Sequence, residues 1–362
     1  RWRVWARAAL EEARIGRTNF PDDAGLAVAE AEAMMGVGAY RLAEAAARPL
    51  LDLYPENKAV QDLGRDIESF HSPALETYAS SARSTPQNIV RGQRSVAWGL
   101  RLDSAPLFYH SRLFAAFDHR ESDYSNGALR HRRFALGYGY RYGRVDASIA
   151  ATDSLYDVEE TGFTARIALQ LDDHAQMALG YESVSMETPL LAAGAGDTSD
   201  RLSLAFSYAF HESRKVRLEL GRMDFTDGNL REFAALGWEE RWYAGPIYQF
   251  RSYLDGYRSR NSLRNVDYFN PKRDQDLTLT LSNRWKTWRR YKRSFHQALD
   301  ISLGRYRQAG FVDGTTFGVS YEHTFEREYG YTLSYGVRRA REFYDGQPEY
   351  VDEVFLRYNR IF

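Results

Sequence analysis

The sequence of 362 residues contains no cysteine, which excludes disulfides, thiolate catalysis and cysteine-based metal sites. It also lacks an apolar run of about 18 residues, so a transmembrane helix is excluded. Its formal charge of -1 gives no reason to expect a nucleic-acid partner. The chain begins at Arg1 without a methionine or a signal peptide, and we expect it to be a processed or truncated piece of a longer protein.

Aromatic residues are abundant by contrast. The 25 Tyr, 20 Phe and 7 Trp make up 14% of a chain whose mean hydropathy is -0.55. A transmembrane β-barrel combines these two properties, because its strands place apolar residues on lipid only at every second position. The composition therefore allows a membrane protein even though the average hydropathy is low.

Helical periodicity dominates residues 1–72. Residues 21–23 (Pro-Asp-Asp) are a helix start signal, and residues 36–38 (Gly-Val-Gly) interrupt the pattern. Residues 54–57 (Tyr-Pro-Glu-Asn) precede a further helix that runs to about Phe70.

One pair of residues in this segment has the spacing of a tetratricopeptide repeat. Ala43 lies twelve residues before Pro55, like the small residue and the proline of that repeat. The first helix of the repeat is degenerate, since Ala31 stands where glycine is usual. One repeat with flanking helices cannot bury a continuous core alone. We therefore predict that residues 1–72 are the C-terminal end of a longer repeat domain; a generic helical linker is the alternative.

From about Leu75 to the last residue, apolar and polar side chains alternate, as in β-strands. Residues 201–210, for example, read Arg-Leu-Ser-Leu-Ala-Phe-Ser-Tyr-Ala-Phe. Sixteen such segments fill residues 75–362, at about 18 residues per strand and connection, and a strand of about ten residues crosses a bilayer. The predicted strands are residues 75–84, 93–103, 106–118, 128–141, 144–152, 160–171, 174–184, 200–210, 215–225, 230–241, 245–256, 275–288, 292–307, 315–326, 330–342 and 350–362.

The predicted connections alternate between short turns and long polar loops. The short turns fall at residues 103–105, 142–143, 172–173, 211–213, 243–244, 289–290 and 327–328, and the long loops at residues 119–127, 185–199 and 257–274. This alternation is typical of an outer-membrane barrel. Both chain ends then lie on the periplasmic side, and the long loops face outside the cell. A soluble β-sandwich or propeller is the alternative, but it does not explain the alternation.

The ends of the predicted strands carry features of membrane barrels. Aromatic residues at these ends fit the girdles at membrane interfaces: Tyr138, Tyr140, Trp238, Trp242, Trp285, Trp288, Tyr329 and Tyr331. The last strand ends at Phe362, with Leu356 and Tyr358 on the same face. It resembles the β-signal that the barrel-assembly machinery recognises, although Arg360 stands where a hydrophobic residue is usual. We predict an all-β transmembrane barrel of about sixteen antiparallel strands over residues 75–362.

A barrel of this size has a lumen wide enough for an aqueous channel. The pleat predicts charges of both signs on the inner face, together with the aromatic residues Phe114 and Tyr253. The acidic residues are Asp146, Glu182, Glu219, Glu239, Asp276, Asp300, Glu322 and Asp352, and the basic ones are Arg101, Arg133, Arg166, Arg201, Arg251, Arg284 and Arg338. Carboxylates and aromatic faces suit a carbohydrate that is neutral or partly cationic. The alternative is that these charges only pair across strands, as in any barrel.

Two stretches of the sequence resemble exopolysaccharide export porins. Residues 267–271 (Asp-Tyr-Phe-Asn-Pro), followed by Arg273 and Asp274, form one, and residues 285–291 (Trp-Lys-Thr-Trp-Arg-Arg-Tyr) form the other. Together with the tetratricopeptide-like segment, they are most similar to the exporters of poly-β-1,6-N-acetyl-D-glucosamine from biofilm-forming Gram-negative bacteria. The resemblance implies outer-membrane export of this polymer in partially de-N-acetylated form. It also implies that a periplasmic deacetylase docks on the helical domain, and no cofactor is expected.

Polymer contacts are expected at two places. Tyr268 and Phe269 fall in the largest predicted external loop, and we expect this loop to fold toward the pore and contact sugar, with Asp267 beside them. An ordinary surface loop with a proline-kinked turn is the alternative. In the lumen, the expected contact residues are Glu182, Glu219, Glu239, Asp300 and Glu322.

Catalytic motifs are scarce, and we expect no enzyme. The adjacent pairs Glu159-Glu160 and Glu239-Glu240 point to opposite faces of a strand, so neither pair can act as acid and base together. The 8 histidines show no metal-binding spacing, and no nucleophile elbow occurs. The alternatives are a cellulose- or alginate-type exporter, a general diffusion porin, or an outer-membrane phospholipase or protease barrel.

Overall fold

The computed structural model describes residues 5–88 and 90–362, and over these residues it contains five helices and sixteen strands. The helices are α1 (Ala6–Asn19), α2 (Ala24–Gly36), α3 (Tyr40–Leu53), α4 (Lys58–Phe70) and α5 (Leu190–Gly194). The strands are β1 (Ala74–Asn88), β2 (Gly92–Asp103), β3 (Ser111–Tyr124), β4 (Gly127–Tyr142), β5 (Val145–Tyr156), β6 (Glu160–Gln170), β7 (Ala175–Glu182), β8 (Ser199–His211), β9 (Arg214–Phe225), β10 (Leu230–Ala244), β11 (Tyr248–Asn261), β12 (Arg273–Arg290), β13 (Arg293–Gln308), β14 (Gly314–Arg327), β15 (Tyr331–Tyr344) and β16 (Gln347–Ile361).

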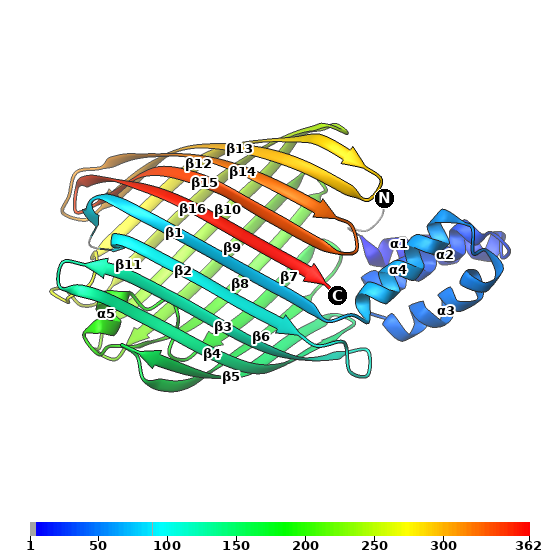
Figure 1. The fold of residues 1–362 in the computed structure, drawn as a ribbon, viewed down its shortest axis with the longest axis horizontal. Helices are drawn as coiled ribbons and strands as arrows, with labels where there is room; N and C mark the ends of the chain where they lie inside the picture. The colour runs from blue at the N-terminus through cyan, green and yellow to red at the C-terminus, as the bar shows by residue number, and fades with distance from the viewer. Residues whose placement is uncertain (1–4, 89) are drawn as a thin grey trace.

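The strands form one closed antiparallel barrel. Each strand pairs with its neighbours in sequence, and β1 also pairs with β16, so that the first and last strands lie side by side in Figure 1. The closed sheet has no free edge to pair with another chain. The predicted fold class and strand number are confirmed.

The four N-terminal helices project from one end of the barrel (Figure 1). Their boundaries follow the predicted signals: the Asp23 side chain accepts a hydrogen bond from the Leu26 amide at 2.9 Å, and Asn57 caps α4 in the same way. Small residues let the helices pack closely, and Ala31 and Ala47 are completely buried in their shared core. The predicted helical segment is confirmed over residues 6–70, while residues 1–4 lie outside the described part of the chain.

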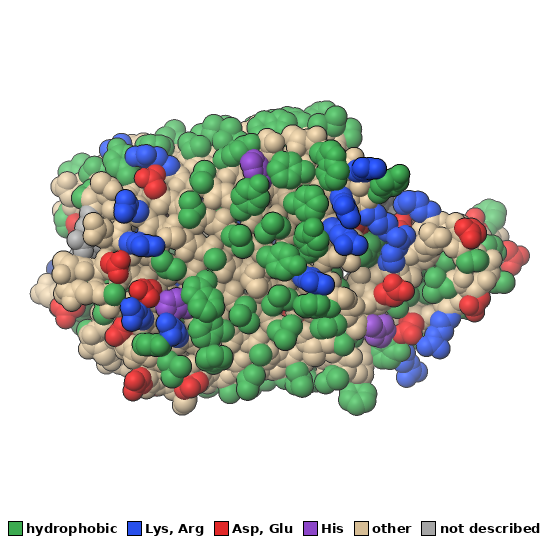
Figure 2. All heavy atoms as spheres, viewed as in Figure 1, with side chains coloured by type: hydrophobic (Ala, Val, Ile, Leu, Met, Phe, Trp, Pro, Cys, Tyr) green, Lys and Arg blue, Asp and Glu red, His purple; other side chains and the backbone are tan. Residues whose placement is uncertain are grey.

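The outer surface of the barrel is apolar. Leu136, Ile149 and Leu303 each expose more than half of their surface, and Figure 2 shows hydrophobic side chains over the middle of the barrel. This is the band that a bilayer covers. No helix in the described part of the chain is both long and apolar enough to span a membrane.

The connections differ from the prediction in several places. We call the end of the barrel next to α1–α4 the helical end and the opposite end the loop end. At the helical end, residues 143–144, 212–213 and 291–292 form short turns, but the turn before β3 covers residues 104–110 and not 103–105. Pro106 supplies no amide for strand pairing, and Phe108 and Tyr109 have positive φ angles of 52° and 68°.

Only two connections at the loop end are long. They cover residues 183–198 and 262–272. The predicted long loop at residues 119–127 is wrong, because β3 continues to Tyr124, which pairs with Gly127. Polar residues at the ends of strands extend the hairpins beyond the membrane, so polarity alone did not mark a loop.

The barrel turns hold the helical segment at both of its ends. The Asp173 carboxylate accepts hydrogen bonds from the first amides of α1, and the Arg112 guanidinium donates to the carbonyls of Phe70 and Ser72 at the end of α4, at 2.5 and 3.1 Å. Between them, Lys292 forms an ion pair with Asp62 of α4 at 3.3 Å. These contacts complete hydrogen bonds that a helix leaves open at its ends.

Candidate functional site in the barrel lumen

The pairing register identifies the side chains that face the lumen, because residues directly opposite one another share a face. Since Leu100, Leu204, Leu279 and similar residues are exposed on the lipid side, the alternate positions face inward. All the predicted inward charges but one follow this register. Asp352 is the exception, since it pairs with Arg339, which itself pairs with the exposed Val319. The prediction that Asp352 lines the lumen is therefore wrong, and its neighbour Glu353 faces inward instead.

Four of the five lumen carboxylates that we expect to contact polymer form ion pairs with arginines in the same wall. Glu239 lies 3.2 Å from both Arg217 and Arg251. The other pairs are Glu182 with Arg133, Glu219 with Arg201, and Glu322 with Arg357. These pairs fix the side chains and leave the wall close to neutral at these positions.

Asp300 is different. Its register neighbours are Ser282 and Ser320, and it forms no ion pair within the described part of the chain. Its Oδ1 atom is buried without a hydrogen-bond partner. A carboxylate in this state has an unused capacity to accept hydrogen bonds, and leaving such a group unsatisfied is unfavourable.

Aromatic side chains also face the lumen, as predicted for Phe114 and Tyr253. Phe114 is buried, and the guanidinium of Arg101 stacks over its ring at 3.7 Å. Tyr257 and Tyr306 flank Asp276 on the neighbouring strands. The wall thus alternates charged pairs with ring faces.

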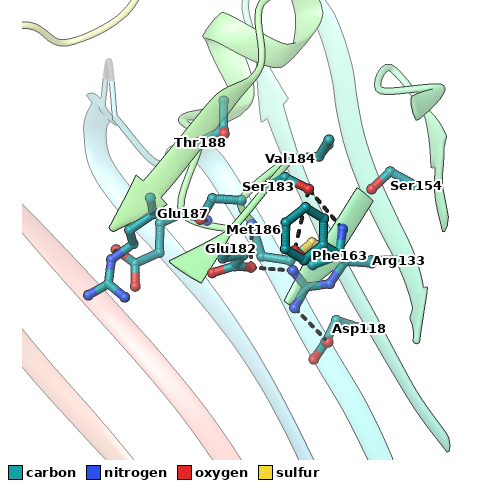
Figure 3. Close-up of polar contacts among 12 residues, drawn as sticks. Asp118, Arg133, Ser154, Phe163, Glu182, Ser183, Val184, Met186, Glu187 and Thr188 are labelled. Carbon is teal, nitrogen blue, oxygen red and sulfur yellow. Dashed lines mark hydrogen bonds and ion pairs between the residues drawn. The ribbon is translucent and has the colours of Figure 1, made fainter. Parts of the chain in front are cut away.

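The connection of residues 183–198 folds into the barrel and not away from it. The Arg120 guanidinium of β3 donates a hydrogen bond to the Met186 carbonyl, and the Glu182 carboxylate accepts one from the Met186 amide at 3.1 Å. Figure 3 shows Glu182 between Met186 and Arg133, which in turn contacts Asp118. Glu187 forms an ion pair with Arg201 at 3.1 Å. The connection is therefore held to both sides of the wall.

The short helix α5 lies within this connection. Leu190 and Ala192 are buried, and Thr188 and Ser199 share a buried hydrogen bond at 2.7 Å. At Gly194 a β-carbon would lie 2.6 Å from the Leu129 side chain, so glycine permits the close approach of α5 to β4. Helix α5 was not predicted, although Pro189 followed by Leu-Leu-Ala-Ala is a helix start signal.

The second long connection, residues 262–272, contains the predicted residues Asp267, Tyr268 and Phe269. Tyr268 is only 4% exposed; its hydroxyl donates to Asp227 at 2.9 Å, and its ring stacks on Phe225. Burial raises the pKa of Tyr268. The Tyr268 ring is thus used in packing within the loop end.

Phe269 and Asp267 occupy different environments. Phe269 is half-buried and packs edge-on against Tyr344 of β15, with 5.1 Å between the ring centroids, while Asp267 is exposed. This connection is shorter than residues 183–198, so the prediction that it is the largest external loop is wrong. The contact with Tyr344 shows that it folds across the mouth of the barrel. A sugar contact by these three residues stays a prediction.

The two long connections meet at the loop end. Ala192 of α5 and Tyr268 belong to one buried cluster with Met223 and Phe225. Through this cluster, residues 183–198 and 262–272 support each other across the mouth.

The described residues offer no site for a metal ion, since no three histidine or acidic side chains come together in a suitable arrangement. Glu239 and Glu240 point to opposite faces: Glu239 pairs with lumen arginines, whereas Glu240 pairs with Arg214 on the lipid side at 2.7 Å.

Comparisons with known proteins place this barrel among membrane barrels. Residues 76–359 match the family model described as the PgaA membrane beta barrel domain. A solved structure described as a bacterial polysaccharide outer membrane secretin has a TM-score of 0.76 at 19% identity, covering 81% of this chain and 99% of that one. No curated protein sequence matches the chain.

Other solved barrels are more distant. Pseudomonas aeruginosa OccK5 (OpdH) has a TM-score of 0.42 at 9% identity, covering 80% of this chain and 98% of that one. CdiB from Acinetobacter baumannii has a TM-score of 0.49 at 8% identity, covering 80% of this chain and 60% of that one. These two similarities add nothing to the argument.

Proposed function

The chain belongs to the family of the PgaA membrane β-barrel domain, and from this premise we propose that it is an outer-membrane porin that exports an exopolysaccharide. The proposed cargo is partially de-N-acetylated poly-β-1,6-N-acetyl-D-glucosamine. The observation that carries the proposal is the family match over residues 76–359, which includes nearly the whole barrel. The proposed activity is transport and not catalysis.

The chemistry of the lumen supports a sugar polymer as cargo. Ring faces such as Tyr253 can stack on the C–H faces of sugars, and hydroxyl groups can exchange hydrogen bonds with the paired charges along the wall. A free amine of a de-acetylated sugar carries a positive charge. The unpaired carboxylate of Asp300 can accept it without breaking an existing ion pair.

The orientation in the membrane is part of the proposal. We place the helical end in the periplasm, so that polymer enters beside α1–α4 and leaves at the loop end. Residues 183–198 and 262–272 then act as the external gate, and the contacts of Met186 and Phe269 are those that break when it opens. The contacts that hold α1 and α4 to the turns support a fixed position of the helices beside the entrance.

The helical segment and the last strand carry the proposed protein partners. We propose that residues 1–72 are the last part of a periplasmic tetratricopeptide domain that docks a polysaccharide deacetylase. The complete burial of Ala43 and Ala47 supports helix packing of that type. We also propose that the barrel-assembly machinery recognises β16 together with Phe362, which directly follows the strand and is 54% exposed.

The test is complementation of an exporter-deleted strain that still synthesises the polymer. The chain, fused to the periplasmic repeat domain of the host's own exporter, should restore polymer at the cell surface. Retention of polymer in the periplasm by cells with a folded barrel contradicts the proposal. If polymer export stays absent while the uptake of small solutes increases, the chain is a general diffusion porin. The same complementation in strains that lack a cellulose or an alginate exporter tests the other exporter type. Restored surface cellulose or alginate, without restored poly-N-acetylglucosamine, would identify that type.

A further inference from the structure

Four arginines form a single row on the lipid face of the barrel at the helical end. Arg290 lies directly opposite Arg293, and Arg293 lies directly opposite Arg327. Tyr331 continues the row between Arg327 and Arg360. Opposed side chains have β-carbons about 4.5–5.5 Å apart, and like charges at that spacing repel. We refer to Arg290, Arg293, Arg327 and Arg360 as the arginine row.

The arginine row has no internal counter-charge. All four side chains are exposed, and none forms an ion pair within residues 5–88 and 90–362. Other exposed arginines on the same strands are paired: Arg305 and Arg307 lie 2.8 and 2.9 Å from Asp313. Figure 2 shows Lys and Arg side chains gathered where the barrel meets the helices. The repulsion within the row therefore calls for an anion from outside the chain.

An apolar belt lies immediately beside the row, toward the middle of the membrane. The next outward positions on the same strands are Trp288, Phe295, Phe325, Leu333 and Tyr358, each directly opposite the next. Trp288 stacks on Phe325 with 6.3 Å between the ring centroids. Aromatic belts mark the level of the lipid head groups, and an arginine beyond that level costs little free energy. The arginine row thus lies at the level of the lipid phosphates, and the apolar belt beside it offers a surface for acyl chains.

A groove of about 800 Å³ connects this row with helix α4. Its volume lies within the range of about 300–1,000 Å³ that is common for ligand sites. Its cationic lining residues are Arg65, Arg290, Lys292, Arg293 and Arg327, and its acidic ones are Glu68 and Glu328. Tyr291 and Phe362, which are 86% and 54% exposed, add apolar surface. Arg65 and Lys292 already pair with Asp62 of α4, at 2.8 and 3.3 Å, so the unpaired positive charge of the groove comes from Arg290, Arg293 and Arg327.

We propose that this groove binds an anionic phospholipid of the periplasmic leaflet, with its phosphate on Arg293 and Arg327 and its acyl chains against the aromatic belt. Arginine binds phosphate in a bidentate manner, and two adjacent guanidinium groups suit one phosphodiester. Because Arg65 and Glu68 of α4 also line the groove, the bound head group lies beside the helical segment. The choice of leaflet rests on the orientation given under the proposed function.

The test compares lipids on the full chain in detergent by native mass spectrometry. The probes are palmitoyl-oleoyl phosphatidylglycerol, the matching phosphatidylcholine and hexa-acyl lipid A. The variant is R293Q/R327Q, and the matched control is R305Q/R307Q, which removes two charges from the lipid face of β13 at the loop end. Heat-modifiable electrophoretic mobility verifies that each barrel is folded. R293Q/R327Q relieves repulsion between like charges, and R305Q/R307Q breaks only exposed ion pairs, each of which contributes about 0–1 kcal/mol, so both variants should fold.

We expect the unchanged chain to retain phosphatidylglycerol over phosphatidylcholine. One basic residue near an anionic lipid contributes about fivefold in binding, so R293Q/R327Q should bind phosphatidylglycerol about thirtyfold more weakly. R305Q/R307Q should leave it unchanged. Brominated phosphatidylglycerol should also quench the fluorescence of Trp288, which is measured as the difference between the unchanged chain and its W288F variant. R293Q/R327Q should lose that quenching.

Two results overturn the inference in distinguishable ways. Equal binding of phosphatidylglycerol and phosphatidylcholine, or an unchanged affinity in R293Q/R327Q, contradicts the proposed lipid site but not the proposed export function. Lipid A bound more tightly than phosphatidylglycerol, and lost in R293Q/R327Q, places this end in the outer leaflet. That result reverses the proposed orientation and, with it, the direction of export.

Discussion

Asp173, in the turn between β6 and β7, caps the amino end of helix α1. Its carboxylate accepts hydrogen bonds from the amides of Arg7 and Ala8, at 3.1 and 2.9 Å. The helix has no capping side chain of its own, because Trp5, which cannot accept a hydrogen bond from the first amides, stands at its N-cap position. A side chain of the barrel, 165 residues away in sequence, therefore supplies the cap. At the other end of the segment, Arg112 fulfils the matching role for the carbonyls of α4.

Replacing Asp173 with alanine should loosen α1 from the barrel. Loss of a capping side chain costs about 1 kcal/mol, which corresponds to roughly fivefold faster hydrogen exchange at the first amides of the helix. Hydrogen–deuterium exchange of residues 7–10 measures this change. E212A is the control, since Glu212 also lies in a turn at the helical end but forms its ion pair with Arg241 of the barrel. Equal exchange in D173A and the unchanged chain would contradict the capping role.

Docking of α4 should weaken in acid. A hydrogen bond from Lys58 lowers the pKa of Asp62 below its ordinary value of 3.8, and the ion pair with Lys292 lowers it further. Because the pKa of Asp62 is lowered in the docked state, its carboxylate contributes fully to the free energy of docking above about pH 4. That contribution is lost as the pH falls through the pKa of Asp62 in the docked state. Fluorescence energy transfer between labels on α4 and on the 291–292 turn measures the change. In D62N the transfer should be weaker at neutral pH and independent of pH in this range.

Replacing Glu182 with glutamine should destabilise the inward fold of residues 183–198. Glu182 joins the Arg133 guanidinium to the Met186 amide, and hydrogen bonds to a charged group contribute about 1.5–3 kcal/mol. We expect open events in planar-bilayer recordings to become about tenfold more frequent. E322Q breaks the Arg357 pair but touches neither long connection, so its recordings should resemble those of the unchanged chain.

Replacing Tyr268 with phenylalanine should loosen residues 262–272. The hydroxyl of Tyr268 donates to Asp227 and accepts from the buried Asn229, and its removal takes one hydrogen-bond partner from each, at a cost of about 1–3 kcal/mol. Faster hydrogen exchange across residues 262–272 is the expected result. Y181F removes a similar bond, to Asp200, between two neighbouring strands, and should leave that segment unchanged.

Replacing Asp300 with asparagine should affect cargo and not stability. Because Asp300 has no ion pair to lose, the stability of the barrel should change by less than about 0.5 kcal/mol. Block of the ion current by glucosamine oligomers should require up to about fivefold more oligomer, because one solvated ion pair contributes up to about 1 kcal/mol. D146N is the control, since Asp146 already pairs with Arg141 and Arg166. A stronger effect of D146N would show that Asp300 is not the contact.

The sequence predicted the parts of the fold that local chemistry determines. Caps at Asp23 and Asn57 gave the helix boundaries, and alternation gave sixteen strands and their inward faces. The prediction of the inward face failed at Asp352. The apolar residues on either side of it, Val351 and Val354, lie on opposite faces of the strand, so the alternation did not show which face is inward. The prediction of a long loop also failed where strands simply continue in polar residues beyond the bilayer, as at Tyr124.

The contacts within the site could not be predicted from sequence. Arg133 and Glu182 are 49 residues apart and lie on strands that are not neighbours, so neither residue signals the other. Whether a lumen charge is paired or unpaired depends on such contacts, and this is why Asp300 was not distinguished from the four paired carboxylates. Similarly, the burial of Tyr268 depends on α5, which lies in a different connection.

The pairing of β1 with β16 has a consequence for biosynthesis. The hydroxyl of Thr77 bonds to the carbonyl of Tyr358, 281 residues later in the chain. Contacts so distant in sequence form slowly, because loop-closure entropy is lost before they are gained. The hairpins between can form early, but the seam cannot close until the ribosome has finished the final strand. Throughout that interval the chain has two unpaired strand edges, and such edges can pair with other chains and favour aggregation.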